Sequence, residues 1–466
     1  MPFARILRSS ALMGGAQVIV LAAGFVRAKA IALILGASGV GLIGLFNAFS
    51  GNVASFAGWG LGTSGVRLIA GAPEESKPTK VAAVRRMGWA LSLLGLGLAL
   101  LTFWPAGYAT FSSSKYALEM AIVACAAPCM IAASAWSAVL QASGKIASLA
   151  KVQIVGALTG LLIGLPAIFF WGTIGIALSI FLAAAVPAAV LWRAARAECP
   201  ASADSPVDSA DLRQLVQIGG ALMVVGWLGQ LSAYAVRLAI VRQEGLDAAG
   251  YYQAAYAISG SLPGFVFAAM GADFFPRVAA AKDEAEADDI TDKQIQAAML
   301  LGLPLIAGLM AAGHVVIRLL YADTFTPAVA LLTWMTWGVF VRLFTWPIGF
   351  RLLARGSSKR LIFIETIASL AMAVAPIIMM QYLGLVGAGV GFLLASIFYG
   401  ATLMAISGYV RRLGFRTKIA AGVSTLFILF TQLIAEWSQL ASCFCALIIS
   451  LVCGVILWNE IRNKNV

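Results

Sequence analysis

The sequence predicts an all-α polytopic membrane protein of about fourteen transmembrane helices, built as two parallel six-helix bundles followed by an extra C-terminal helix pair. The first observation is composition: 61% of the 466 residues are hydrophobic and 11% are charged, whereas soluble domains are about 45–50% apolar. The second is that apolar stretches close to the ~20 residues needed to span a bilayer recur along the whole chain. The third is that lysine and arginine collect at alternate connections between these stretches.

The apolar stretches predict each span in order. Six lie in the first part of the chain, at about 10–34, 40–66, 87–106, 116–140, 151–171 and 173–193. Six more follow at about 214–241, 250–274, 297–320, 327–350, 360–382 and 385–410. A final pair lies at about 417–436 and 440–458. Residues 1–35 exceed the length of a secretory signal core and lack an early small-residue cleavage site, so they are interpreted as a retained first span.

Charge sorting tests this count independently of hydropathy. With the N-terminus inside, 25 of the 32 basic residues fall at the inner ends of the spans. The other seven are Arg27, Lys29, Lys115, Arg237, Arg242, Arg318 and Arg342. Because cytoplasmic loops carry the lysine and arginine excess, both termini are predicted to be cytoplasmic.

The net charge of +12 is spread over every inner loop, which indicates membrane topology and attraction to anionic lipid headgroups. It does not indicate nucleic-acid binding. The six cysteines show no paired CxxC spacing, and the chain contains a single histidine. We therefore expect neither a metal site nor a disulfide framework.

A weak internal repeat divides the chain. GLIGLFNAFSG at 41–51 matches GYYQAAYAISG at 250–260 with an offset of 209 residues, and Arg27 and Arg237 are 210 residues apart. Two halves that both start inside with an even number of spans must be parallel repeats. The predicted domains are a bundle at 1–193, a cytoplasmic linker at 194–213, a bundle at 214–410 and an additional hairpin at 411–466.

Between the spans, the linker is polar and contains two prolines, as expected for a cytoplasmic connection. The segment 277–296 is the most acidic stretch of the chain. We interpret it as a solvated amphipathic surface helix.

Cations inside apolar stretches are the main functional signal. A charge at the bilayer centre costs roughly 2.5–3.5 kcal/mol on insertion scales, so such residues usually face something polar. Arg27, Arg237 and Arg342 are therefore candidates for an anion-binding lumen, with a structural ion pair as the equal alternative. Lys29 is a weaker candidate because it points about 200° away from Arg27 on a helix and can extend to the interface.

Polar residues that carry no positive charge give weaker signals. Asn47 is a candidate for contact with a hydroxyl-rich substrate, although hydrogen bonding between helices is favoured. Glu365 is a candidate for binding a coupling proton or sodium ion, although an ion pair with a neighbouring arginine is favoured. Acids are otherwise scarce at mid-membrane, which argues against a site for organic cations.

Catalytic motifs are missing from the sequence. Gly39, Gly41 and Gly44 spell GxGxxG, but they lie between two membrane helices and not after a strand, so they do not indicate a dinucleotide site. No nucleophile with an adjacent base and no carboxylate dyad is recognisable. The sequence predicts a protein that is not an enzyme and needs no cofactor.

The stretch from Arg27 to Arg67 resembles the polysaccharide repeat-unit flippases, called Wzx-type, of the multidrug/oligosaccharidyl-lipid/polysaccharide (MOP) exporter superfamily. There a basic residue ends span one and is followed by Leu-Gly-x-x-x-x-Gly and an aliphatic second span. Those positions here are Arg27, Leu35, Gly36 and Gly41. Such flippases usually have twelve spans, and the last two spans here are more similar to the extra pair of the lipid II flippases, which helps to accommodate the polyprenyl tail.

The resemblance implies a V-shaped pair of bundles in the bacterial inner membrane. It would flip an undecaprenyl-pyrophosphate-linked oligosaccharide to the periplasmic leaflet by alternating access, for O-antigen, lipopolysaccharide or related surface polysaccharides. The implied partners are the lipid-linked glycan, membrane lipids and a polysaccharide polymerase with its chain-length machinery. Two alternatives stay open: an ion-coupled multidrug antiporter of the same superfamily, and a membrane scaffold that transports nothing.

Overall fold

The computed structural model describes residues 2–199, 208–354, 358–409 and 412–464, and its described part is helical without strands. The helices of the first half are α1 (Pro2–Ala57), α2 (Leu61–Ala70), α3 (Lys77–Phe111), α4 (Ala117–Ala124), α5 (Ala126–Ala142), α6 (Ile146–Leu162) and α7 (Gly164–Glu198). They are followed by α8 (Ser209–Glu244), α9 (Leu246–Ala279), α10 (Glu284–Leu320), α11 (Ala328–Ala354), α12 (Ser358–Leu383), α13 (Val386–Ser407), α14 (Phe415–Trp437) and α15 (Gln439–Lys464). Single 3₁₀ turns lie at Glu74–Ser76 and Asp323–Phe325. The predicted all-α membrane fold is confirmed.

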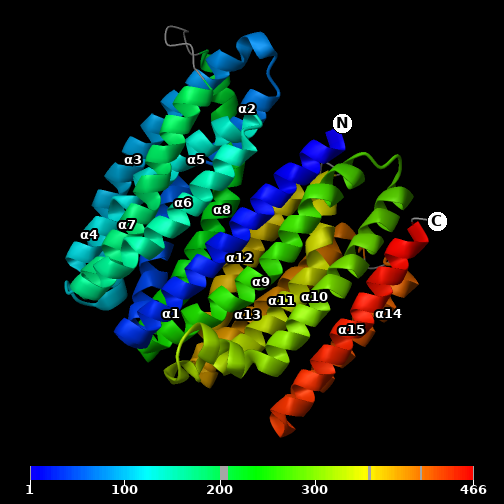
Figure 1. The fold of residues 1–466 in the computed structure, drawn as a ribbon. Helices are drawn as coiled ribbons and strands as arrows, with labels where there is room; N and C mark the ends of the chain where they lie inside the picture. The colour runs from blue at the N-terminus through cyan, green and yellow to red at the C-terminus, as the bar shows by residue number, and fades with distance from the viewer. Residues whose placement is uncertain (1, 200–207, 355–357, 410–411, 465–466) are drawn as a thin grey trace. The chain divides into compact units, whose positions relative to one another are not determined.

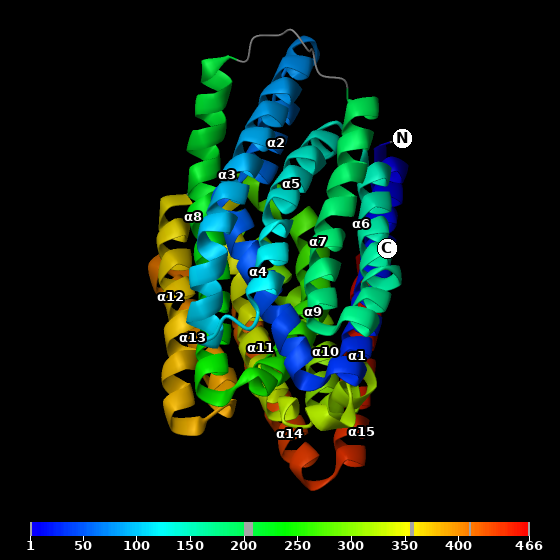
Figure 2. The ribbon, with the colours of Figure 1, turned by 90° about the vertical axis from the view of Figure 1, so that its left-hand side faces the viewer.

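The chain divides into two compact units, Met1–Gly250 and Tyr251–Val466. In the first unit, α5 and α6 both pack along α7, and α3 packs along α5 (Figure 2). In the second, α10, α11 and α13 form the packed centre, α12 covers α13, and α14 and α15 form a hairpin against α10 (Figure 1). Each unit has its own apolar core, around Trp136 in the first and around Leu343 in the second.

Helix α1 contains two passes because the chain reverses at Gly36. Gln17 lines the same cavity as Leu191, and Leu191 belongs to the same core cluster as Leu61, so residues 17 and 61 lie toward one end of the unit. Gly36 adopts φ 68° and ψ −161°, a region open essentially only to glycine. This reversal separates the first predicted span from the second.

A second reversal lies at Gly172, inside α7. Gly164 packs so closely on Ser179 that an added Cβ would lie 2.9 Å from the serine Cβ, and Gly160 faces Ala183 in the same manner. Both pairs are centred in the sequence next to Gly172, as expected where two antiparallel helices meet. Helix α6 with residues 164–171 therefore forms one pass, and residues 173–198 form the next. The structure thus agrees with the spans predicted at 151–171 and 173–193.

Ten helices in the described part of the chain are long and apolar enough to cross a membrane. One of them is α1 with its two passes, and shorter apolar helical stretches lie at Ile146–Leu162 and Ala441–Val455. The chain is therefore a multi-pass membrane protein. The total of fourteen spans and the orientation of the termini stay predictions.

The boundary between the compact units lies beyond the predicted linker because α8 packs against α1, α2 and α3 of the first unit. Polar bonds run along most of this helix: Asn52 Nδ2 donates to the carbonyl of Gln230 at 3.0 Å, and Trp59 Nε1 donates to that of Val216 at 3.0 Å. Asn52 thus joins two helices, as favoured for the polar residues of these spans. Linker residues 200–207 lie outside the described residues, and the predicted domain boundaries stay predictions.

The acidic stretch 277–296 is amphipathic and exposes most of its acids, as predicted, but it also leads into a membrane span. It is largely the first part of α10, which continues without interruption to Leu320. Asp283 caps this helix by accepting from the Glu286 N–H, and Glu286 accepts in return from the Lys282 N–H, an arrangement close to a capping box. Ala287 and Thr291 are fully buried, so one side of the stretch packs against protein and is not solvated.

The other acids of this stretch bind one end of the second unit together. Arg351 on α11 is 4% exposed and donates to Glu284 at 2.6 Å and to Asp288. Asp292 accepts from the Tyr409 hydroxyl at 2.9 Å and from the Gly414 N–H at 2.7 Å. Burial raises the pKa of Tyr409, so its hydroxyl stays a donor. The start of α10 therefore fixes the end of α11 and the segment that leads into α14.

Replacement of Gly36 by alanine should cost about 1–3 kcal/mol of stability, since only the backbone dihedrals, and no neighbouring atom, oppose the new side chain. Gly15→Ala is the matched control, because that glycine is helical and also has open space around it. Thermal unfolding of both purified variants in detergent measures the difference. Equal stability would contradict the reversal at Gly36.

Replacement of Arg351 by methionine should cost about 2 kcal/mol. The two acids lose the buried guanidinium that binds them, although Glu284 is half-exposed and water screens part of the loss. Lys293→Gln removes an exposed pair with Asp289 and should change stability by less than about 0.5 kcal/mol. Thermal unfolding compares the two variants, and a stability of Arg351→Met equal to that of the control would show that the network does not hold the unit.

Candidate functional site: a cationic cavity in the first unit

A cavity of about 550 Å³ lies inside the first unit, between α1, α6 and α7 with a contribution from α5. Small residues line it: Gly24 has open space around it, whereas Gly156 and Gly160 let Pro187 and the Arg27 guanidinium approach closely. An added Cβ at Gly156 would lie 2.8 Å from the Pro187 ring. Helices α6 and α7 are therefore in close contact at one edge of the cavity.

Arg27 is the charge in this cavity. Its Nη2 donates to Ser179 Oγ at 2.6 Å, and that hydroxyl donates onward to the Ile176 carbonyl at 2.7 Å. Gly160 lies directly beneath the guanidinium, because an added Cβ there would lie 3.1 Å from Nη1. The Nε atom is buried and has no hydrogen-bond partner.

The charge of Arg27 is not neutralised by an acid in the part of the chain that the structure describes. Its neighbours in the cavity are neutral, and the side-chain amides of Gln17 and Gln153 make no hydrogen bond to described residues. A half-buried guanidinium with an unused N–H, in a cavity that two free amides also line, is a site for an anion that also carries hydroxyl groups.

The other cation predicted from the repeat lies elsewhere in the same unit. Arg237 on α8 is 6% exposed, and its Nη1 donates to the Ala233 carbonyl at 2.8 Å. It is not among the residues that line the Arg27 cavity. Arg242, one turn further, donates from Nε to the Ala109 carbonyl at 2.7 Å and so ties α8 to α3. The structure does not bring Arg27 and Arg237 to one described cavity.

Two weaker candidates of the first unit also lie outside that lining. Lys29 is half-buried on α1, two residues beyond Arg27, as its different helix face predicts. Asn47 is exposed, and its Nδ2 donates to the Ile43 carbonyl of its own helix at 2.8 Å. Neither side chain contributes to the cavity, and their role in substrate binding stays a prediction.

The remaining candidates belong to the second unit. Glu365 on α12 is half-buried and accepts a hydrogen bond from Tyr399 of α13 at 2.9 Å. Arg342 on α11 is exposed. No basic residue of the described chain lies within 4 Å of the Glu365 carboxylate. The favoured ion pair is therefore not formed, and a tyrosine hydroxyl takes its place.

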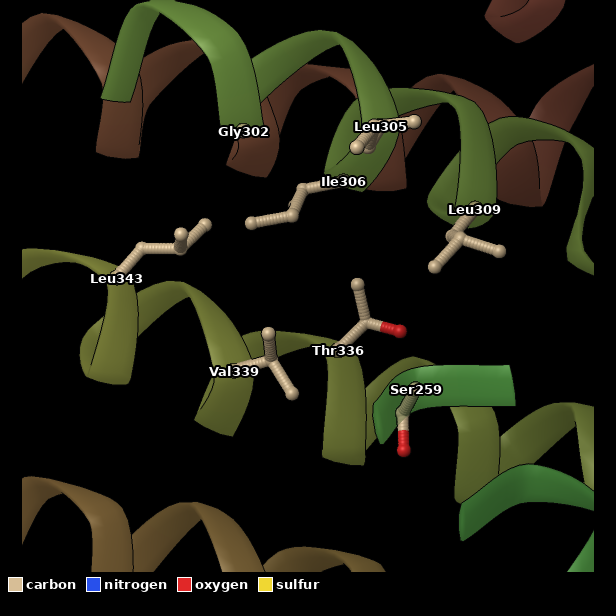
Figure 3. A pocket seen from close by; sticks show the side chains of 8 residues that line it. All are labelled: Ser259, Gly302, Leu305, Ile306, Leu309, Thr336, Val339 and Leu343. Carbon is tan, nitrogen blue, oxygen red and sulfur yellow. The ribbon is translucent and has the colours of Figure 1, made fainter. Parts of the chain in front are cut away.

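A depression between α9, α10 and α11 of the second unit is not a ligand site (Figure 3). Leucine, isoleucine and valine side chains converge on it and leave no room for a water molecule. Its two hydroxyls are already used, since Ser259 donates to the Tyr256 carbonyl and Thr336 to the Leu332 carbonyl. The depression is part of the helix packing.

Sequence reasoning missed the surroundings of Arg27. Ser179, Gly160 and Gln153 lie more than a hundred residues from it along the chain, and each resembles many other small or polar residues of the spans. Only the paired reversals at Gly36 and Gly172 bring them together.

Comparison with known proteins decides the family. The model of a family described as polysaccharide biosynthesis protein matches residues 6–282, more than half of the chain. The chain belongs to this family. The resemblance to the repeat-unit flippases of the MOP superfamily is thereby confirmed at the level of family and fold. No curated protein matches the chain.

Solved structures show the fold of this family member. The chain is similar to the lipid II flippase MurJ in an inward closed conformation, with a TM-score of 0.77 and 13% identity over 98% of this chain and 100% of that one. It is also similar to an inward-facing multidrug resistance MATE transporter of the MOP superfamily, with a TM-score of 0.72 and 16% identity over 87% and 95%. At 13% and 16% identity, these similarities show the fold of the chain.

Proposed function

We propose that this protein flips an undecaprenyl-pyrophosphate-linked oligosaccharide from the cytoplasmic to the periplasmic leaflet of the bacterial inner membrane. The observation that carries the proposal is the half-buried guanidinium of Arg27, which meets no acid of the described chain in a largely apolar cavity of a membrane bundle. A membrane protein keeps such a charge where it meets something polar. The membership in the polysaccharide biosynthesis family supports a glycan-bearing anion.

Each group of the cavity then has a role. The Arg27 guanidinium offers a planar set of donors to pyrophosphate oxygens, and its Nε supplies an N–H that no described residue uses. Gln17 and Gln153 offer amides to sugar hydroxyls. The polyprenyl tail stays in lipid, and alternating access moves the headgroup. The product would serve a polysaccharide polymerase with its chain-length machinery, for O-antigen, lipopolysaccharide or a related polymer.

The two alternatives are less well supported. An exporter of organic cations needs an acid in its binding cavity, and the residues that line the Arg27 cavity include no carboxylate. A scaffold without transport gains nothing from a cavity and a guanidinium without an acid, both of which reduce its stability.

Arg27→Gln and Arg237→Gln should each lower transport at least tenfold with normal protein levels, and Arg27→Lys should keep part of the activity because the charge remains. The measurement is the sidedness of undecaprenyl-pyrophosphate-linked oligosaccharide in membranes from cells that carry each variant. Arg318→Gln is the control, since Arg318 is an exposed cation that pairs with Asp323 and does not line the cavity of Arg27. Full activity in both the Arg27→Gln and the Arg237→Gln variant would remove the anion-site proposal.

Coupling to protons or sodium ions is proposed for Glu365, the half-buried acid that accepts from Tyr399. Glu365→Gln should make the remaining transport independent of the driving gradient, because the side chain no longer carries a negative charge. Tyr399→Phe removes only the hydrogen bond and should preserve that dependence. Transport into vesicles with an imposed proton or sodium gradient tests both variants, and an unchanged gradient dependence of Glu365→Gln would refute this role.

A further inference from the structure

A second cavity of the first unit, of about 330 Å³, lies beside a break in the second span. Helix α1 ends at Ala57 and α2 begins at Leu61, with Trp59 and Gly60 at positive φ between them. The Trp59 indole donates to the Val216 carbonyl and so fixes the break against α8. The walls come from α1, α2, α5 and α8. This cavity shares no lining residue with the cavity of Arg27.

Its polar side chains are unused. Most serine and threonine hydroxyls of the described spans donate to a carbonyl of their own helix, as at Ser50 and Ser92. The hydroxyls that line this cavity and the amide beside them make no side-chain hydrogen bond to described residues. They are Ser55, Thr63, Ser134 and Gln230. Four groups that can donate and accept therefore face one hollow from four helices.

Charge and shape restrict the ligand. The lining contains no charged residue, in contrast to the cavity of Arg27. Met130, Ile131 and Met223 supply apolar wall beside the hydroxyls and the amide. The volume is near the lower end of the ~300–1,000 Å³ found for ligand pockets. These properties suit a neutral ring with hydroxyls around its edge and C–H groups on its faces.

We infer that this cavity binds one sugar unit of the transported glycan, apart from the pyrophosphate. The inference rests on the proposed function, since it names a part of that substrate. The glycines of the break supply the room: an added Cβ at Gly62 would lie 2.6 Å from Ser134 Oγ, so the hydroxyl reaches the hollow only because Gly62 has no side chain. The first unit would thus bind the headgroup at two sites, with the pyrophosphate at Arg27 and a neutral sugar ring in the second cavity.

The test uses the purified full-length protein in detergent, with methyl β-D-glucopyranoside and its N-acetylglucosamine counterpart as probes in saturation-transfer NMR. The double variant Ser55→Ala/Ser134→Ala should bind the glycosides at least tenfold more weakly than the wild type. The matched control is Ser50→Ala/Ser92→Ala, whose hydroxyls bond within their own helices. It should bind like the wild type. Equal binding by the two double variants, or no binding of either glycoside by the wild type, would overturn the inference.

A second variant fills the cavity without a polar change. At Gly51 an added Cβ would make an ordinary contact, 3.7 Å from Gln230 Nε2, and alanine favours the helix. Gly51→Ala should therefore stay folded and bind the glycosides several-fold more weakly. Wild-type affinity in a folded Gly51→Ala protein would count against the site.

The same proteins separate this inference from the proposed function. Arg27→Gln should abolish the change in sidedness while it keeps glycoside binding within twofold of the wild type. Hydroxyl-dependent glycoside binding without transport of the lipid-linked oligosaccharide would refute the proposed function and retain the sugar site. If the protein transports the lipid-linked oligosaccharide but binds the glycosides equally well without the Ser55 and Ser134 hydroxyls, the proposed function stands and the sugar site is refuted.

Discussion

The peptide groups of a chain in hydrocarbon must bond to one another, because no water is there to replace a missing partner. Every described span of this protein meets that requirement as a helix. Exceptions to helical geometry are therefore few and local. The reversals at Gly36 and Gly172 and the break at Trp59 and Gly60 are three places where the backbone leaves the helix. The cavity of Arg27 lies beside the segments joined at Gly172, and the second cavity of the first unit lies beside the break.

Small residues decide how closely the helices approach and where they leave space. Gly164 against Ser179 closes the contact between two passes, and Gly156 and Gly160 next to it line the cavity of Arg27. Without water, association of helices in lipid depends on such close packing. Glycine therefore allows close helix contact at some positions and lines a cavity at others.

Two arginines, Arg351 and the half-buried Arg27, show how the surroundings determine the role of a charge. Arg351 is bound by Glu284 and Asp288 and holds the end of α11 to the start of α10. Arg27 has a serine hydroxyl and no acid in the described chain. Both are cations near apolar helices, but one is neutralised by the protein and the other remains available to a ligand. The proposed recognition of a pyrophosphate depends on that difference.

The sequence by itself determined the helical membrane class, the positions of most reversals and the cation Arg27 inside a span, because bilayer thickness and the cost of a buried charge act on any chain. It also pointed to the family through the motif around Gly36. Only the tertiary structure decided that α8 packs in the first unit, that Glu365 meets a tyrosine hydroxyl, and that Ser179 and Gln153 join Arg27. These contacts join residues far apart in the chain, and their side chains are chosen by the packing of whole helices, which no local pattern records.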